Sequence, residues 1–150
     1  MKIVPGTGKF VFHLAKREKH LLSEVLRLYP CLPSGHHLKK MSQMPDASKR
    51  LLDEALAEQR AETKMAVAAF LSEPRRFVQA DGGWRFGVST EELEWLLQVL
   101  NDIRVGSWVL LGSPEERLEL TRLNEQTAPH FWAMEMAGFF QMEMLKALNR

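Results

Sequence analysis

Residues 77–88 read FVQADGGWRFGV and carry the clearest strand signal in the chain. Two runs of aromatic and β-branched residues flank Asp81-Gly82-Gly83, and glycine supplies the positive φ that a tight hairpin turn needs. The pattern therefore predicts a β-hairpin. Because an isolated two-stranded hairpin is only marginally stable in water, this one must pack against helices or join another strand. Residues 9–14, KFVFHL, follow a PGTG turn and are the candidate for that strand.

The rest of the chain is dominated by helical patterns. Ser89 and Glu92 form a capping-box pattern at the start of one helix, and Gly112 follows its expected end. Apolar spacing and Pro or Gly stops place the helices at residues 15–29, 46–72 and 89–111, from 113, and from 127 to the C-terminus. The expected fold is mainly α: a single bundle-like domain, residues 1–150, of about five helices with a small β-hairpin and a short N-terminal strand.

The composition is that of a globular protein rather than a disordered or membrane chain. The 150 residues are 45% hydrophobic and 26% charged, which suits one domain with a real core. The start, MKIVPGTGKF, breaks at Pro5 before a signal-peptide core could form, and no apolar run approaches the roughly 20 residues of a membrane span. Cys31 stands alone, which excludes an internal disulfide. We expect a cytoplasmic protein without membrane contact.

Charge is divided unevenly along the chain. The net charge of +1 is the balance of +6 over residues 1–80 and −5 over residues 81–150. Segments of opposite sign favour packing on one another or on a second copy. A charge of +6 spread over 80 residues is too dilute for the usual footprint of a nucleic-acid-binding domain, so a nucleic-acid partner is not expected.

Polar residues cluster at the start of a very apolar stretch, LNDIRVGSWVLLG at residues 100–112. On a helical wheel Arg104 shares the stripe of buried leucines, Asn101 lies to one side and Asp102 points nearly opposite. Arg104 is therefore expected to be enclosed. Its replacement by alanine should then lower the free energy of unfolding by about 3–5 kcal/mol. These three residues either fix helix packing or line a pocket for a small anion or a peptide, and the sequence leaves both open.

The same core supports a resemblance. The sequence Leu100-Asn101-Asp102-Ile103-Arg104, with Phe139-Phe140 and Leu145 on the last helix, resembles an uncharacterised helical bacterial family, best represented in actinobacteria and often encoded near a Clp-protease adaptor. The resemblance spans most of the chain, although only the five-residue core is specific. It implies a helical regulatory or interaction protein, and it lends no catalytic residues.

Signatures of catalysis are sparse. Cys31 with His36 and His37 is the only pairing of a nucleophile with a base, and no third group or activating helix terminus is evident. The paired spacing of zinc ligands and the phosphate-binding glycine motifs are absent. We therefore expect no metal, no cofactor and no enzyme. The alternative is a small-molecule-binding protein or enzyme with a site near Arg104 and the 31–37 loop.

The last helix, FWAMEMAGFFQMEMLKAL at residues 131–148, is apolar around its whole circumference. It is either the core helix or a helix with one face exposed until a partner covers it, and methionine suits such adaptable surfaces. The possible interface residues are Trp132, Met136, Phe139 and Met142. The leading hypothesis is a non-catalytic interaction or regulatory protein that self-associates, most simply as a homodimer, through its apolar C-terminal helices.

Overall fold

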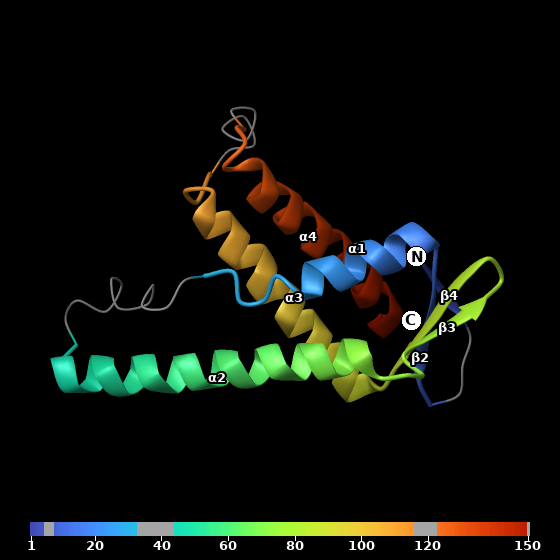
Figure 1. Ribbon diagram of the computed structural model, residues 1–150, viewed down its shortest axis with the longest axis horizontal. Coiled ribbons are helices and arrows are strands. Elements are labelled where there is room, and N and C mark those ends of the chain that lie inside the picture. Colours follow the sequence, from blue (N-terminus) through green and yellow to red (C-terminus); the bar gives the residue numbers. More distant parts are fainter. Residues whose placement is uncertain (5–7, 33–43, 116–122, 150) are drawn as a thin grey trace.

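The computed structural model describes residues 1–4, 8–32, 44–115 and 123–149. In it, one four-stranded antiparallel sheet packs beside a group of helices (Figure 1). The elements in chain order are β1 Lys2–Val4, β2 Phe10–Leu14, α1 Lys16–Leu26, α2 Asp46–Ser72, β3 Phe77–Ala80, β4 Gly83–Val88, α3 Thr90–Leu110 and α4 Ala128–Leu148.

The predicted hairpin, β3 and β4, forms one half of the sheet, whose strand order is β1-β2-β4-β3. Asp81 and Gly82 occupy its two-residue turn with φ of 49° and 74°, the left-handed pair that suits the twist of a hairpin. Strand β2 pairs with β4, with Phe12 opposite Phe86, so the strand expected at 9–14 joins the hairpin. Strand β1 was not predicted, and it completes the edge of the sheet by pairing with β2.

One cross-strand row of apolar residues faces the helices. Across the sheet, Ile3 lies opposite Phe12, Phe12 opposite Phe86, and Phe86 opposite Phe77. The ring centroids of Phe77 and Phe86 are 5.0 Å apart, and those of Phe12 and Phe86 are 6.2 Å apart. Such rows of neighbouring side chains are the unit that stabilises a sheet. This row joins the buried residues of α1, α3 and α4 in one core.

The expected fold class is wrong. The described residues form four helices and a four-stranded sheet, so the protein is a mixed α and β structure rather than a mainly helical bundle of about five helices. The sheet is a full layer of the structure because its inner face supplies Phe12, Leu14, Phe86 and Val88 to the core. The helix expected from residue 113 does not begin there: residues 113–115 are not helical, and residues 116–122 lie outside the described part.

Helix α2 has the predicted bounds but packs differently from the other helices. Figure 1 shows it running along one side of the molecule, with its N-terminal half extending away from the remaining elements. Only Val67 and Phe70, near its C-terminal end, are fully buried, whereas Leu51 is 68% exposed. Its alanine-rich, charged sequence has the composition of a helix that tolerates this exposure.

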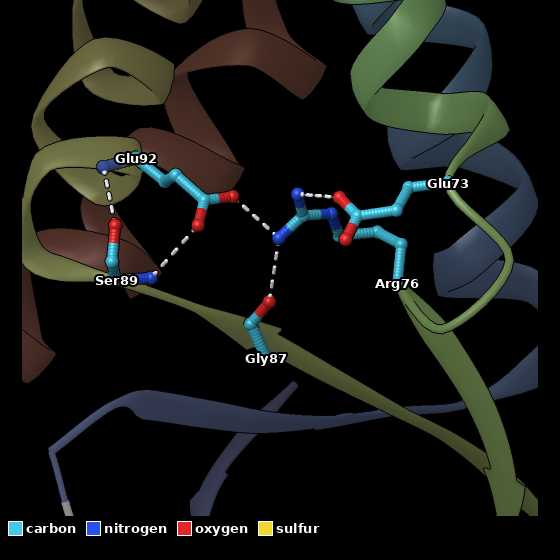
Figure 2. Close-up of polar contacts among 5 residues, drawn as sticks. All are labelled: Glu73, Arg76, Gly87, Ser89 and Glu92. Atoms are coloured by element: carbon cyan, nitrogen blue, oxygen red, sulfur yellow. Dashed lines mark hydrogen bonds and ion pairs between the residues drawn. The ribbon is translucent and has the colours of Figure 1, made fainter.

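The capping box predicted at the start of α3 is confirmed. The backbone N–H of Glu92 donates to Ser89 Oγ at 3.1 Å, and the backbone N–H of Ser89 donates to Glu92 Oε1 at 3.4 Å. These two contacts satisfy donors that the first turn of a helix otherwise leaves without partners. They also fix the direction in which the Glu92 carboxylate points (Figure 2).

The Glu92 carboxylate meets an arginine that the sequence analysis did not single out. Figure 2 shows Arg76 between Glu73, Glu92 and the backbone of Gly87. Its Nη1 donates to Gly87 O at 3.0 Å and lies 2.5 Å from Glu92 Oε2, and its Nη2 pairs with Glu73. The guanidinium carbon also lies 3.9 Å from the centre of the Phe70 ring. This ionic cluster therefore joins the end of α2, strand β4 and the start of α3.

The close approach of β2 and β4 predicts a specific requirement for glycine. A Cβ at Gly83 would lie 2.3 Å from the carbonyl oxygen of Leu14, a backbone atom that cannot move away easily. We expect Gly83→Ala to lower the free energy of unfolding by about 1–3 kcal/mol, measured by urea denaturation. Gly87→Ala in the same strand is the matched control, because a Cβ there meets nothing within 4 Å. Equal stability of the two variants would contradict this account of the strand packing.

Candidate interaction groove between helices α3 and α4

An open groove lies along the seam between α3 and α4. These helices form the most extensive helix pair of the structure and run antiparallel, joined at one end of the molecule (Figure 1). The groove has a volume of about 620 Å³, and most of its lining comes from α4. Its lining residues are Arg104, Met134, Glu135, Gly138, Phe139, Gln141, Met142 and Leu145.

Arg104 lies at the wall of this groove and is exposed, so the expectation that it is enclosed is wrong. Its Nη2 donates to Asn101 Oδ1 at 2.9 Å and its Nε donates to Gln141 Oε1 at 3.2 Å. The side chain passes over Gly138, whose missing Cβ would lie 3.6 Å from Arg104 Cδ. Because a glycine lies beneath it, the guanidinium reaches water instead of the core. The loss of about 3–5 kcal/mol expected for Arg104→Ala therefore no longer follows.

The three polar residues of 101–104 do not form one network. Asn101 and Arg104 face α4, where the amide of Gln141 also contacts Asn101 Oδ1 at 3.5 Å. Asp102 is about 200° from Arg104 around the helix and faces α2 instead. Burial raises the pKa of the Asp102 carboxyl, and the charge of Arg60 only partly offsets this effect. Asp102 and Arg104 are thus close in sequence but belong to two different surfaces of α3.

Helix α4 has one buried and one exposed face. Its buried face carries Ala133, Ala137, Phe140, Met144 and Ala147. Of the possible interface residues, Trp132 and Met136 are partly buried against the core, whereas Phe139 is 40% and Met142 60% exposed. One side of this helix is therefore core, and the other side is exposed; its role as an interface stays a prediction.

Exposed apolar side chains gather on this part of the molecule. In the described part of the chain, seven of the twelve exposed large hydrophobic residues belong to α3 or α4. Phe139, Met142 and Leu145 follow one another at helical spacing and line the groove together. Sequence analysis missed Met134, Gly138 and Leu145 as members of this surface, although Met134, Gly138 and Met142 follow one another at a spacing of four residues and Leu145 follows Met142 by three.

The region around Cys31 has no reactive arrangement among the described residues. Burial raises the pKa of the Cys31 thiol, and Ser107 Oγ lies 3.8 Å from its sulfur. A thiol with a raised pKa is a poor nucleophile at neutral pH. His36 and His37 lie outside the described residues. Within the described ranges, no group of three His, Cys, Asp or Glu side chains is placed to hold a metal ion.

No protein-family model, curated protein or solved structure matches this chain. The resemblance that rests on residues 100–104 stays a prediction. None of the helices in residues 1–4, 8–32, 44–115 and 123–149 is long and apolar enough to cross a membrane. The groove itself is therefore the basis for a functional proposal.

The environment of Asp102 predicts a pH-dependent effect on stability. Because its pKa is raised in the folded protein, ionisation of this carboxyl weakens the native state as pH rises through that pKa. We expect Asp102→Asn to increase the free energy of unfolding at pH 7, by less than about 1 kcal/mol because water screens a half-exposed group. The gain should vanish near pH 3, where both states are largely protonated. Urea denaturation at both pH values measures it.

Glu94→Gln, an exposed acid on the same helix, is the control for this measurement. In this variant, the difference in the free energy of unfolding between pH 7 and pH 3 should be close to that of the unmodified protein. An Asp102→Asn protein that is less stable than the unmodified protein at pH 7 would show that the carboxylate has a stabilising partner.

Proposed function

We propose that this protein is a non-catalytic interaction protein, regulatory in role, that works as a homodimer through the groove between α3 and α4. The observation that carries the proposal is the row formed by Phe139, Met142 and Leu145. Each of these side chains is at least 40% exposed, and they lie side by side along a groove of about 620 Å³. Exposed apolar surface of this kind marks interaction sites.

The groove is suited to binding the same groove on a second copy of the protein. In an antiparallel crossing of two α4 helices with the two-fold axis at Gly138, residues equally distant from Gly138 in sequence face each other. Met142 then meets Met134 of the other copy. Phe139, one residue from the axis, packs at the crossing once the Arg104 side chain that lies over each Gly138 turns towards the other copy's Glu135. The proposed interface is thus apolar at its centre, with methionine packing on methionine.

The charges of the groove also favour self-association. Its lining contains one cation, Arg104, and one acid, Glu135. An antiparallel two-fold brings the Arg104 of each copy towards the Glu135 of the other, so that the interface is neutral and has two equivalent charge contacts. Such contacts at the rim of an interface contribute more to the choice of partner than to affinity.

The available area is of the right order for a dimer. Helix α4 has 21 residues and is therefore about 31 Å long, and two adjacent helices present a face about 20 Å wide. This gives about 600 Å² of flat area, and a standard interface covers about 800 Å² of accessible surface on each partner. One face of the α3–α4 pair is thus enough.

Sedimentation velocity tests the proposal. We expect a dimer at tens of micromolar that persists or strengthens as salt is raised from about 0.05 M to about 1 M, because high salt favours apolar contacts and screens ionic ones. A dimer that dissociates at high salt would point instead to pairing of the basic and acidic halves of two copies. A monomer at tens of micromolar in low and high salt alike would overturn both arrangements.

A further inference from the structure

A second cavity lies on the side of α3 that faces away from the groove. It has a volume of about 280 Å³ and lies between the middle of α2, residues 29–32 and α3. Pockets for drug-sized ligands usually measure about 300–1,000 Å³, so this cavity suits a smaller molecule. The proposed dimer does not use it.

Two opposite charges line this cavity, Arg60 from α2 and Asp102 from α3. The charge of Arg60 lowers the pKa of the Asp102 carboxyl, against the larger effect of burial. Within the described residues, however, no hydrogen bond or ion pair engages either side chain, which means that they are not in direct contact. This differs from Asn101 and Arg104, which lie on the same turn of α3 and satisfy each other.

The Asp102 carboxylate is therefore unpartnered at an exposed position on the cavity wall. Burial disfavours its charge, and no donor of the described chain compensates for this. A carboxylate in such a position has room for a group from outside the chain to pair with its charge. A bound ammonium group would supply the missing hydrogen bonds and the missing charge.

The remaining walls are mostly apolar. Leu32, Leu56 and Val105 contribute aliphatic surface. Gly106 allows the 29–32 segment to come close to α3, since a Cβ there would lie 3.0 Å from Cys31 Cβ. The cavity thus combines an anion, a cation and a short apolar wall, and these are the complements of an ammonium, a carboxylate and an aliphatic side chain.

We propose that this cavity binds a free α-amino acid with an apolar side chain. The ammonium group pairs with Asp102, the carboxylate pairs with Arg60, and the side chain packs against Leu56 and Val105. The bound zwitterion bridges two charges that the protein leaves apart. Since the cavity borders α2 and α3, occupancy also ties the extended helix α2 to the rest of the molecule.

Isothermal titration calorimetry with L-leucine, L-methionine and L-phenylalanine tests the proposal on the full chain. We expect at least one of them to bind. For that amino acid, the N-acetyl derivative lacks the ammonium and the amide derivative lacks the carboxylate. Each should bind at least about 10-fold more weakly, because each leaves a charged group without its partner. Binding of none of the three amino acids, or equal binding of the acetylated form, would overturn the proposal.

Two variants connect binding to the cavity. Asp102→Asn and Arg60→Gln should each weaken binding by about 10-fold or more. Arg75→Gln is the matched control, because Arg75 is exposed outside this cavity and should leave affinity unchanged. Circular dichroism verifies that each variant is folded. Binding that survives both cavity variants would place the amino acid elsewhere and contradict the assignment. The dimer measurement is independent of this result.

Discussion

Replacement of Phe139 by glutamate is expected to convert the dimer into a monomer, raising the dissociation constant by at least about 100-fold. The Phe139 ring lies next to the two-fold axis, at the centre of the proposed interface. Glutamate removes this apolar contact and places a charge where water is excluded, next to the same charge of the symmetry-related residue. Because Phe139 is 40% exposed in the single chain, the fold itself should tolerate the change. Sedimentation velocity over a concentration series measures the effect.

Leu51→Glu is the matched control for this variant. Leu51 is 68% exposed on α2, outside the groove, so the same substitution there should leave the dimer intact. If Phe139→Glu stays dimeric while its circular dichroism is unchanged, the interface does not include this face of α4. If both variants dissociate, the effect is not specific to the groove.

Replacement of Arg76 by alanine should have the largest effect on stability, a loss of about 3 kcal/mol in the free energy of unfolding. The Arg76 side chain is only 10% exposed and holds Glu92, Glu73 and the carbonyl of Gly87 together. Removing it leaves a buried oxygen of Glu92 without its counter-charge. It also separates the end of α2 from the start of α3. Urea denaturation followed by circular dichroism measures the loss.

A second variant separates the charge of Arg76 from its packing. Arg76→Met keeps an aliphatic stem over the Phe70 ring but removes the guanidinium. The decrease in the free energy of unfolding for Arg76→Met should still be most of the decrease for Arg76→Ala. Glu73→Gln, at a carboxylate that is 53% exposed, should lose less than about 1 kcal/mol. If Arg76→Met were as stable as the unmodified protein, the cluster would act through packing alone.

Local patterns predicted several elements well. The glycine turn at residues 81–83 and its flanking runs gave the bounds of the hairpin, because turn chemistry and strand composition act over a few residues. The Ser89 and Glu92 pair gave the start of α3 for the same reason. Gly112 ends that helix with φ of 90°, as its position predicted.

Features that depend on residues distant in the sequence could not be predicted from such local patterns. Strand β1 has three residues, too few for a pattern, and exists because β2 offers an open edge. The Arg76 cluster joins groups from three elements, so no local sequence pattern predicts it. Arg104 shares a stripe with buried leucines, but Gly138 on the facing helix leaves its head group in water. These outcomes depend on tertiary contacts, which also made the sheet larger than expected.

A disulfide across the proposed two-fold axis tests the dimer most directly. Gly138→Cys in a Cys31→Ser background places one thiol of each copy at the crossing of the two α4 helices. Its Cβ meets only Arg104 Cδ, at 3.6 Å, so the substitution fits the fold. A disulfide needs Cα atoms about 4.4–6.8 Å apart, and the proposed crossing at Gly138 requires such an approach once each Arg104 side chain turns towards the other copy's Glu135. We predict a covalent dimer on mild oxidation, with Leu51→Cys in the same background staying uncross-linked. Failure of Gly138→Cys to cross-link, or equal cross-linking of both variants, would contradict the proposed interface.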